Sequence, residues 1–173
     1  YSRGGATGSA KDYFESQFGA SYDFNFDVSD IITLKRTREY YGGNDADGND
    51  LRPAEMIADA CKIASDKGVD FSIYDQDGDG EVDNVFVIFA GGDEADYIEG
   101  NDNCIWSHAW YIRDGAGIDL TLSGKVINRY ACCSELTAVD DKEVMTGIGT
   151  FCHEYSHTLG LPDMYATDSG QSG

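Results

Sequence analysis

The stretch FCHEYSHTLGLPD, residues 151–163, contains two of the three histidines in the chain. His153 and His157 are four residues apart, and on a helix residues with this spacing lie one turn apart on the same face. Both imidazoles are then able to bind one ion at the distance of about 2 Å that zinc requires. Glu154 is offset by one position, which places its carboxylate beside the ion rather than on it. The pattern predicts a metal-binding helix with an adjacent general base.

A catalytic tetrahedral zinc needs a third protein ligand and an open fourth position. Gly160 readily adopts the left-handed conformation that ends a helix, so the chain is expected to turn back and present Asp163 as that ligand. The extended pattern is HExxHxxGxxD, with the zinc ligands His153, His157 and Asp163. In this interpretation Glu154 activates a zinc-bound water. The alternatives are a buried helix with hydrogen-bonded histidines and a zinc site without catalysis.

A second metal site is predicted at DQDGDGEVD, residues 75–83, which resembles the first nine positions of an EF-hand loop. Its predicted calcium ligands are Asp75, Asp77, Asp79, Glu81 and Asp83. The twelfth position is Phe86 instead of a bidentate glutamate, so another segment or water must complete the shell. The alternative is a solvated acidic turn. Calcium at this loop is expected to serve stability rather than chemistry.

The other acidic stretch and the third histidine are not interpreted as metal ligands. The acidic stretch with Asp45, Asp47 and Asp50 fits a calcium loop less well and is interpreted as a solvated loop. His108, in IWSHAW, is interpreted as a hydrogen-bonded packing residue, with a place in the substrate cleft as the alternative.

The rest of the chain predicts an α/β (α+β) fold, with a mixed twisted sheet, packed helices and an active-site helix near the C-terminus. Helices are expected over 9–19, 52–68 and 145–160, because each has an apolar face with capping residues at its ends. Strands are expected in YDFNFDV, ITLKR and NVFVIFA, the last as the central strand covered on both faces. IDLTLSGKVINRYA is expected to form a hairpin that turns at Ser123 and Gly124.

Composition narrows the classes of partner. The 173 residues fit one domain, and their formal charge of −20 disfavours nucleic acid and anionic membrane surfaces. No run of 18 apolar residues occurs, so no membrane insertion is expected, and the oligomeric state stays open. The five cysteines are interpreted as small buried hydrophobes, with one bridge between Cys104 and Cys132 or Cys133 as the alternative.

The zinc motif, together with YSRGGATGSAKDYF, YDQDGDGEVDNVFVIFAG, IWSHAW and INRYACCSEL, resembles secreted bacterial metallopeptidases of the immune inhibitor A type. The resemblance covers most of the chain. It implies zinc ligands at His153, His157 and Asp163, with Glu154 as general base and later acid. It also implies a metzincin-like fold, secretion, and protein or peptide substrates. Residues 1–173 would form one catalytic domain that continues beyond Gly173 to a methionine turn and a C-terminal subdomain.

The leading hypothesis from these residues is a zinc-dependent endopeptidase with a structural calcium ion. A zinc aminopeptidase or another zinc hydrolase is the first alternative, and a comparison of blocked with free-ended peptides would discriminate it. A calcium-stabilised surface or adhesion module with an inactive zinc site is the second, although the presence of Glu154 argues against it.

Overall fold

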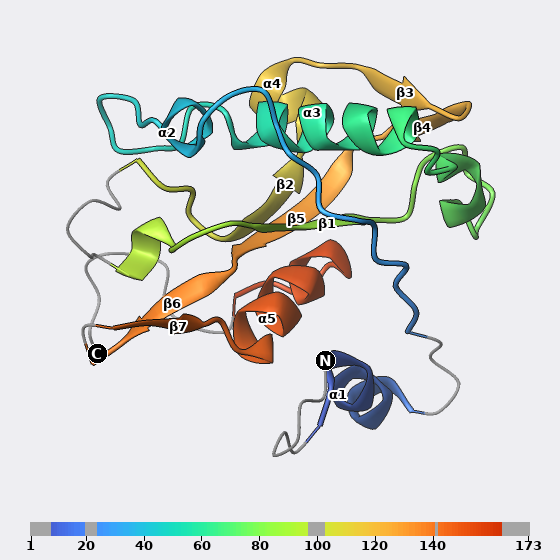
Figure 1. Ribbon diagram of the computed structural model, residues 1–173. Helices are drawn as coiled ribbons and strands as arrows, with labels where there is room; N and C mark the ends of the chain where they lie inside the picture. Colours follow the sequence, from blue (N-terminus) through green and yellow to red (C-terminus); the bar gives the residue numbers. More distant parts are fainter. Residues whose placement is uncertain (1–7, 20–23, 97–102, 141, 164–173) are drawn as a thin grey trace.

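The computed structural model describes residues 8–19, 24–96, 103–140 and 142–163 (Figure 1). Five α-helices lie in these ranges: α1 Ala10–Phe18, α2 Arg38–Tyr41, α3 Pro53–Asp66, α4 Ile112–Ala116 and α5 Ile148–Thr158. The strands are β1 Val85–Phe89, β2 His108–Tyr111, β3 Leu120–Leu122, β4 Lys125–Ile127, β5 Arg129–Ser134, β6 Leu136–Val139 and β7 Lys142–Met145. Two short 3-10 helices, η1 Phe71–Tyr74 and η2 Glu94–Asp96, complete the described elements. The predicted α+β class is confirmed.

A three-stranded sheet in the order β1-β5-β2 forms the centre of the fold. β5 pairs with β1 in parallel and with β2 antiparallel, so that Cys132 lies opposite both Val87 and His108. Five of the six residues of β5 are buried. The sheet is mixed, as predicted, but β5 occupies the central position that the sequence assigned to β1.

The prediction that β1 is central is wrong for a reason visible in its side chains. Val85, Val87 and Phe89 pack in the main core on one face of the strand. Phe86 faces the other way, with its ring centroid 4.2 Å from that of Phe151 on α5. One face of this edge strand is therefore covered by the core and the other is covered only at Phe86, since Ile88 on that same face is exposed. The resulting apolar run looks like that of a central strand.

Helices cover the two faces of this sheet (Figure 1). α3 and α4 lie against one face, and α5 lies against the other, in contact with β5 and β2. α3 confirms its prediction: Pro53 stands in its first turn, and its apolar face enters the core through Met56 and Ile57. No helix among the described residues has the length and apolarity that crossing a bilayer requires.

The two strands expected between residues 22 and 36 are not formed where the structure describes this segment, from residue 24 onward; residues 22 and 23 lie outside it. The alternation has another cause. Phe24 and Phe26 pack against α5, whereas Ile32 and Leu34 pack against the main core. An extended segment that buries alternate side chains shows the period of a strand without pairing with one.

An aromatic cluster anchors the N-terminal helix to the back of α5. It consists of Phe14, Phe24, Phe26, Phe151 and Tyr155, with neighbouring ring centroids mostly about 5 Å apart. α1 itself begins with the predicted capping box between Ser9 and Asp12. The cluster connects α1 and the segment with Phe24 and Phe26 to α5, and through Phe151 it also reaches Phe86 on β1.

Two further predictions are confirmed. The β3-β4 hairpin turns at Ser123 and Gly124, both with positive φ, at 51° and 76°. All five cysteines are free and buried, in accordance with the small-hydrophobe interpretation rather than the bridge from Cys104.

Candidate metal centre

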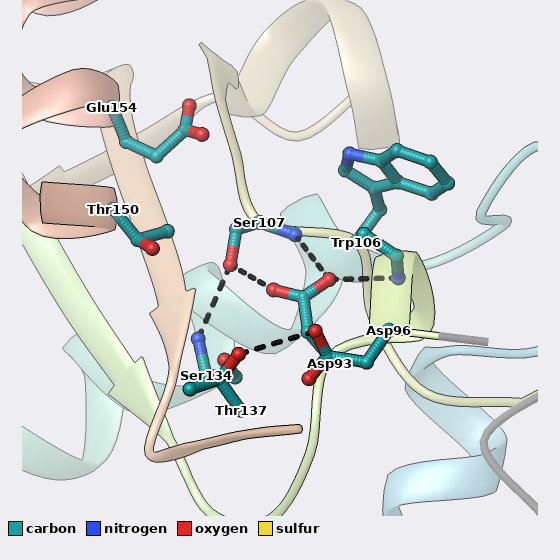
Figure 2. A pocket seen from close by; sticks show the side chains of 9 residues that line it. Asp93, Asp96, Trp106, Ser107, Ser134, Thr137, Thr150 and Glu154 are labelled. Carbon is teal, nitrogen blue, oxygen red and sulfur yellow. Dashed lines mark hydrogen bonds between the residues drawn. The ribbon is translucent and has the colours of Figure 1, made fainter. Parts of the chain in front are cut away.

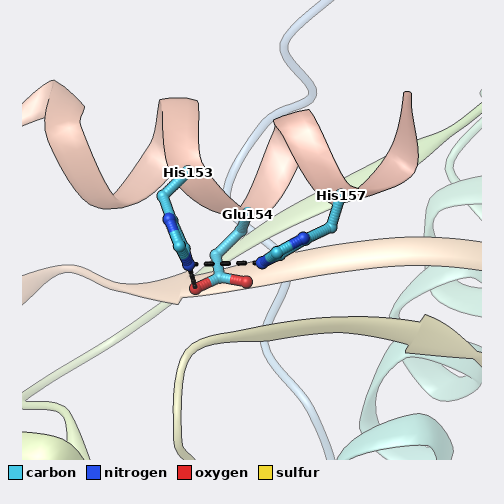
Figure 3. Close-up of side chains that lie close together, drawn as sticks. All are labelled: His153, Glu154 and His157. Carbon is cyan, nitrogen blue, oxygen red and sulfur yellow. Dashed lines mark hydrogen bonds and ion pairs between the residues drawn. The ribbon is translucent and has the colours of Figure 1, made fainter. Parts of the chain in front are cut away.

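α5 presents the histidine pair on one face (Figure 3). The helix begins after Gly147, later than predicted, because Met145 belongs to β7. His153 and His157 project from the same side with ring centroids 4.7 Å apart, and Glu154 lies between them (Figure 3). The helical spacing predicted from the sequence is therefore realised.

Three donor atoms converge at the predicted zinc position. The Nε2 atoms of His153 and His157 are 3.2 Å apart, and each is 3.3 Å from Oδ1 of Asp163. Ligands held at about 2.0–2.1 Å by a tetrahedral zinc are separated by about 3.3–3.4 Å. The triangle thus has the size of one face of a zinc tetrahedron, and the fourth corner of that tetrahedron carries no ligand from the described residues.

The hydrogen bonds of these groups also fit a metal. Nδ1 of His157 lies 2.8 Å from the carbonyl oxygen of Leu161, an arrangement in which Nδ1 donates and Nε2 keeps its lone pair. Oδ1 of Asp163 is buried and accepts no hydrogen bond from the described residues. A lone-pair nitrogen and an unsatisfied carboxylate oxygen pointing at each other leave a place that a cation satisfies.

Gly160 positions the third ligand through the end of the helix. Its φ is +85°, its N–H donates to the carbonyl of His157, and the N–H of Leu161 donates to the carbonyl of Ser156. This pair of bonds is the Schellman motif, which requires a left-handed residue at this position. The turn returns Asp163 to the histidines and places the Leu161 carbonyl at the His157 ring.

Replacing Gly160 with Ala is expected to destabilise the protein by about 1–2 kcal/mol, because a Cβ disfavours the left-handed conformation. Replacing Gly149, inside α5, with Ala is the matched control. A Cβ there meets nothing within 4 Å, so helix propensity should raise stability by up to about 1 kcal/mol. Thermal unfolding should move in opposite directions for the two variants. Equal melting temperatures would contradict the role of the turn.

Glu154 is the buried member of the site. Only 6% of the residue is exposed, and burial raises the pKa of its carboxyl to about 7. Its Oε1 lies 4.0 Å from Nε2 of His153, beside the ligand triangle and outside hydrogen-bonding range. It also lines a pocket next to the site (Figure 2). Its ligand oxygen lies within 4.8 Å of the nitrogen atoms of both histidines.

A buried polar network beneath Glu154 was not predicted. Asp93 accepts hydrogen bonds from the backbone N–H and the hydroxyl of Ser107, whose oxygen in turn accepts from the N–H of Ser134 (Figure 2). The network joins the loop after β1 to the start of β2 and the end of β5. The only sign of this network in the sequence is the position of Asp93, which directly follows Gly91 and Gly92 at the end of an apolar run.

The acidic loop brings part of its predicted ligand set together. Carboxylate oxygens of Asp75, Asp77 and Asp79 lie within 4.8 Å of one another. Asp75 is fully buried, and its Oδ1 has no hydrogen-bond partner among the described residues, whereas its Oδ2 lies 2.5 Å from Nζ of Lys125. The ammonium holds the pKa of Asp75 below its usual range. Lys125 therefore acts as an internal counter-charge that sequence reasoning missed.

The two later loop residues, Glu81 and Asp83, are not part of this close group, but they line the same pocket as Asp77 and Asp79. A carboxylate oxygen of Asp83 accepts the backbone N–H of Gln76, and Glu81 forms a backbone bridge with Val126. The loop also leads to α5, because Asn84, next to Asp83, donates to the hydroxyl of Thr158. The acidic loop is thereby tied to the C-terminal end of the metal-binding helix.

The plainer interpretations agree with the structure except at Asp50. Its Oδ1 is buried without a hydrogen-bond partner among the described residues, and burial raises the pKa of its carboxyl to about 7, so this residue does not belong to a solvated loop. Asp45 accepts N–H groups of its own loop, and Asp50 accepts the N–H of Trp106. This stretch does not gather three carboxylates in the described part of the chain. His108 bridges the carbonyl of Trp106 and the hydroxyl of Tyr130 through its two ring nitrogens, as expected of a packing residue.

These observations describe a candidate metal centre, and comparison with known proteins gives the family of the domain as a metallopeptidase family. The immune inhibitor A peptidase M6 catalytic domain matches residues 2–173, and the chain belongs to this family. Immune inhibitor A of Bacillus thuringiensis subsp. alesti is 34% identical over 178 residues, which cover 91% of this chain and 26% of the relative.

A second relative comes from another bacterium. The pre-pro-metalloprotease PrtV of Vibrio cholerae serotype O1 is 27% identical over 184 residues, which cover 95% of this chain and 20% of that protein. The chain thus spans about a quarter or less of the length of these relatives.

Proposed function

We propose that this chain is the catalytic domain of a zinc-dependent endopeptidase that acts on proteins or peptides. The observation that carries the proposal is the triangle of donor atoms, with sides of 3.2, 3.3 and 3.3 Å, beside a buried glutamate. His153, His157 and Asp163 would hold the metal. When bound, zinc lowers the pKa of a water molecule and polarises the carbonyl of the bond to be cut.

Glu154 would carry the proton in this reaction. Its carboxylate accepts a proton from the attacking water and returns it to the amine that leaves, so that one C–N bond is cleaved and one water is consumed. Burial beside the donor triangle raises the pKa of the Glu154 carboxyl, which makes its carboxylate a better proton acceptor. Leu161 supports the site by fixing the tautomer of His157.

Cleavage within a chain is supported by the edge of the sheet. β2 pairs only with β5 among the described residues, and Trp106, just before it, lines the pocket beside Glu154. An extended substrate backbone pairs readily with such an edge and passes across the site without a free end. A location outside the cell is part of the proposal, because the Vibrio relative is named as a pre-pro form.

The proposal is tested with internally quenched peptides blocked at both ends. Cleavage inside such peptides, its loss with a zinc chelator and its return with added zinc are expected. Removal of single residues from peptides with free amino ends alone would identify an aminopeptidase instead. Absence of all cleavage in zinc-loaded protein would favour the inactive binding module.

We also propose that calcium binds at the acidic loop. Support comes from the convergent carboxylates of Asp75, Asp77 and Asp79 and from the unsatisfied, buried Oδ1 of Asp75. Lys125 would share Asp75 with the ion. Because the loop is bound to the end of α5 through Asn84, calcium would stabilise the metal-binding helix.

At 100-fold excess over its dissociation constant, calcium is expected to add about 2.7 kcal/mol and raise the melting temperature by about 5–10 °C. Asp79→Asn should abolish most of this shift. Asp45→Asn, in the other acidic loop, should leave it unchanged and serves as the control. Calorimetric scans with and without calcium make the comparison, and an equal shift in all three proteins would refute a site at residues 75–83.

A further inference from the structure

The acidic loop is paired with a cation that belongs to the protein itself. Nζ of Lys125 lies 2.5 Å from Oδ2 of Asp75, whose side chain is fully buried. Lys125 is the first residue of β4, and this strand is bound to the loop by two backbone hydrogen bonds. The N–H of Val126 donates to the carbonyl of Gly80, and the N–H of Val82 donates to the carbonyl of Val126. The backbone therefore fixes both partners of the ion pair.

Lys125 leaves one oxygen of Asp75 unsatisfied. Oδ2 accepts the ammonium and the N–H of Gly80, the latter at 3.1 Å. Oδ1 is buried and has no hydrogen-bond partner among the described residues. A carboxylate has lone pairs for two cations, one on each oxygen, and an unpaired buried oxygen is costly. Asp75 is thus able to bind Lys125 and a metal ion at the same time.

The neighbouring carboxylates have no cationic partner. Asp77 and Asp79 are each held by a backbone N–H of the loop, at 3.1 and 2.7 Å, which fixes them without neutralising them. Arg129 lines the pocket over the loop, but its guanidinium donates to the carbonyl of Thr158 at 3.2 Å. Within the described part of the chain, Lys125 forms the only ion pair with the loop.

A fixed ammonium at this place acts in opposite ways on the ion-free and the calcium-bound loop. Without calcium, it reduces the mutual repulsion of the clustered carboxylates and so favours the loop conformation that gathers them. With calcium, two cations bind one carboxylate and repel each other. The affinity of calcium loops depends on the charge of their ligands, and Lys125 reduces that negative charge by one.

Resting on the calcium site proposed above, we infer that Lys125 is an internal counter-charge that sets the calcium affinity of the acidic loop. It holds the ligands together in the ion-free protein and weakens the binding of calcium. The loop is consequently formed before calcium binds, and it responds to higher calcium concentrations than its carboxylates alone would.

The experiment removes the charge of Lys125 with two neutral side chains. Lys125→Gln keeps an N–H donor for Asp75, and Lys125→Met keeps a long unbranched stem, so the result does not depend on one replacement folding well. For both variants we expect the dissociation constant for calcium, measured by titration calorimetry, to fall about tenfold or more. Their melting temperatures in a calcium chelator should also fall, because a buried carboxylate loses its partner.

Lys62→Gln is the matched control. It removes the same charge from an exposed ion pair with Asp59 on α3, at 3.3 Å, and should leave both measurements unchanged. Loss of binding in Asp79→Asn assigns the measured calcium to the loop.

The results that overturn the inference differ from those that overturn the calcium site. Unchanged or weaker calcium binding in the Lys125 variants would overturn the inference and leave the site intact, since Lys125 would then only shape the loop. An equal gain in Lys62→Gln would overturn it as well, because the effect would come from the net charge of the protein. Unchanged melting temperatures in chelator would refute the stabilising role of Lys125. If neither the unmodified protein nor the variants bind calcium at the loop, the calcium proposal and the inference fail together.

Discussion

Replacing Glu154 with Gln is expected to lower kcat/KM for peptide cleavage by about 10²–10⁴-fold while zinc stays bound. General acid–base catalysis contributes effects of this size, and an amide cannot accept the proton of the attacking water. The side chain is nearly isosteric and lies outside the ligand triangle, so His153 and His157 keep their positions. Steady-state kinetics with a quenched peptide and zinc analysis on the same preparation make the measurement.

Glu143→Gln provides the control for this variant. Glu143 is exposed on β7 and lies outside the site, so the same chemical change there should leave both rate and zinc content unaltered. Full activity of the Glu154 variant would contradict the assigned role. Loss of zinc together with activity would instead place Glu154 among the ligands.

Asp163→Ala is expected to weaken zinc binding by at least about 100-fold, and activity at limiting zinc should fall with it. Loss of a group that only supports a ligand already costs 10–100-fold in affinity, so loss of a ligand should cost at least as much. Oδ1 of Asp163 is within 3.3 Å of both imidazole nitrogens, so its removal leaves a two-ligand site. Competition with a chromophoric chelator measures the affinity.

The control is Asp114→Ala, which removes an exposed carboxylate from α4 on the opposite face of the sheet. It should bind zinc like the unmodified protein. Unchanged zinc affinity in the Asp163 variant would show that the third ligand lies elsewhere. This variant tests the part of the motif that depends on the turn at Gly160 and not on helical spacing alone.

The arrangement of the candidate metal ligands was predictable because its geometry is local. His153, Glu154 and His157 lie within five residues of a helix, where spacing alone decides which side chains share a face. Asp163 follows through a single left-handed glycine, whose effect on the chain direction is also local. Helix α3 was predictable for the same reason, since its caps and its apolar face lie in one continuous segment.

Features that depend on distant contacts were missed. β1 lies at an edge because only β5 pairs with it among the described residues, and an edge strand partly covered by a helix has the same apolar run as a central one. Phe24 and Leu34 alternate with polar residues because they reach two different clusters, not because they pair in a sheet. Residue type alone does not separate these cases.

The polar surroundings of the site belong to the same class. Asp93 meets Ser107 across 14 positions of sequence, and Lys125 meets Asp75 across 50. No motif connects such pairs, so sequence patterns predicted the candidate ligands but not the polar groups around them. The pocket beside Glu154 could therefore be recognised only in the folded chain.

The most direct test of the account is an anomalous diffraction measurement at the zinc absorption edge on crystals of zinc-loaded protein. One strong peak is expected at about 2.0–2.2 Å from Nε2 of His153, Nε2 of His157 and Oδ1 of Asp163, with Glu154 outside the coordination shell. A map without a peak between these three atoms, or with zinc bound only at other residues, would contradict the central claim.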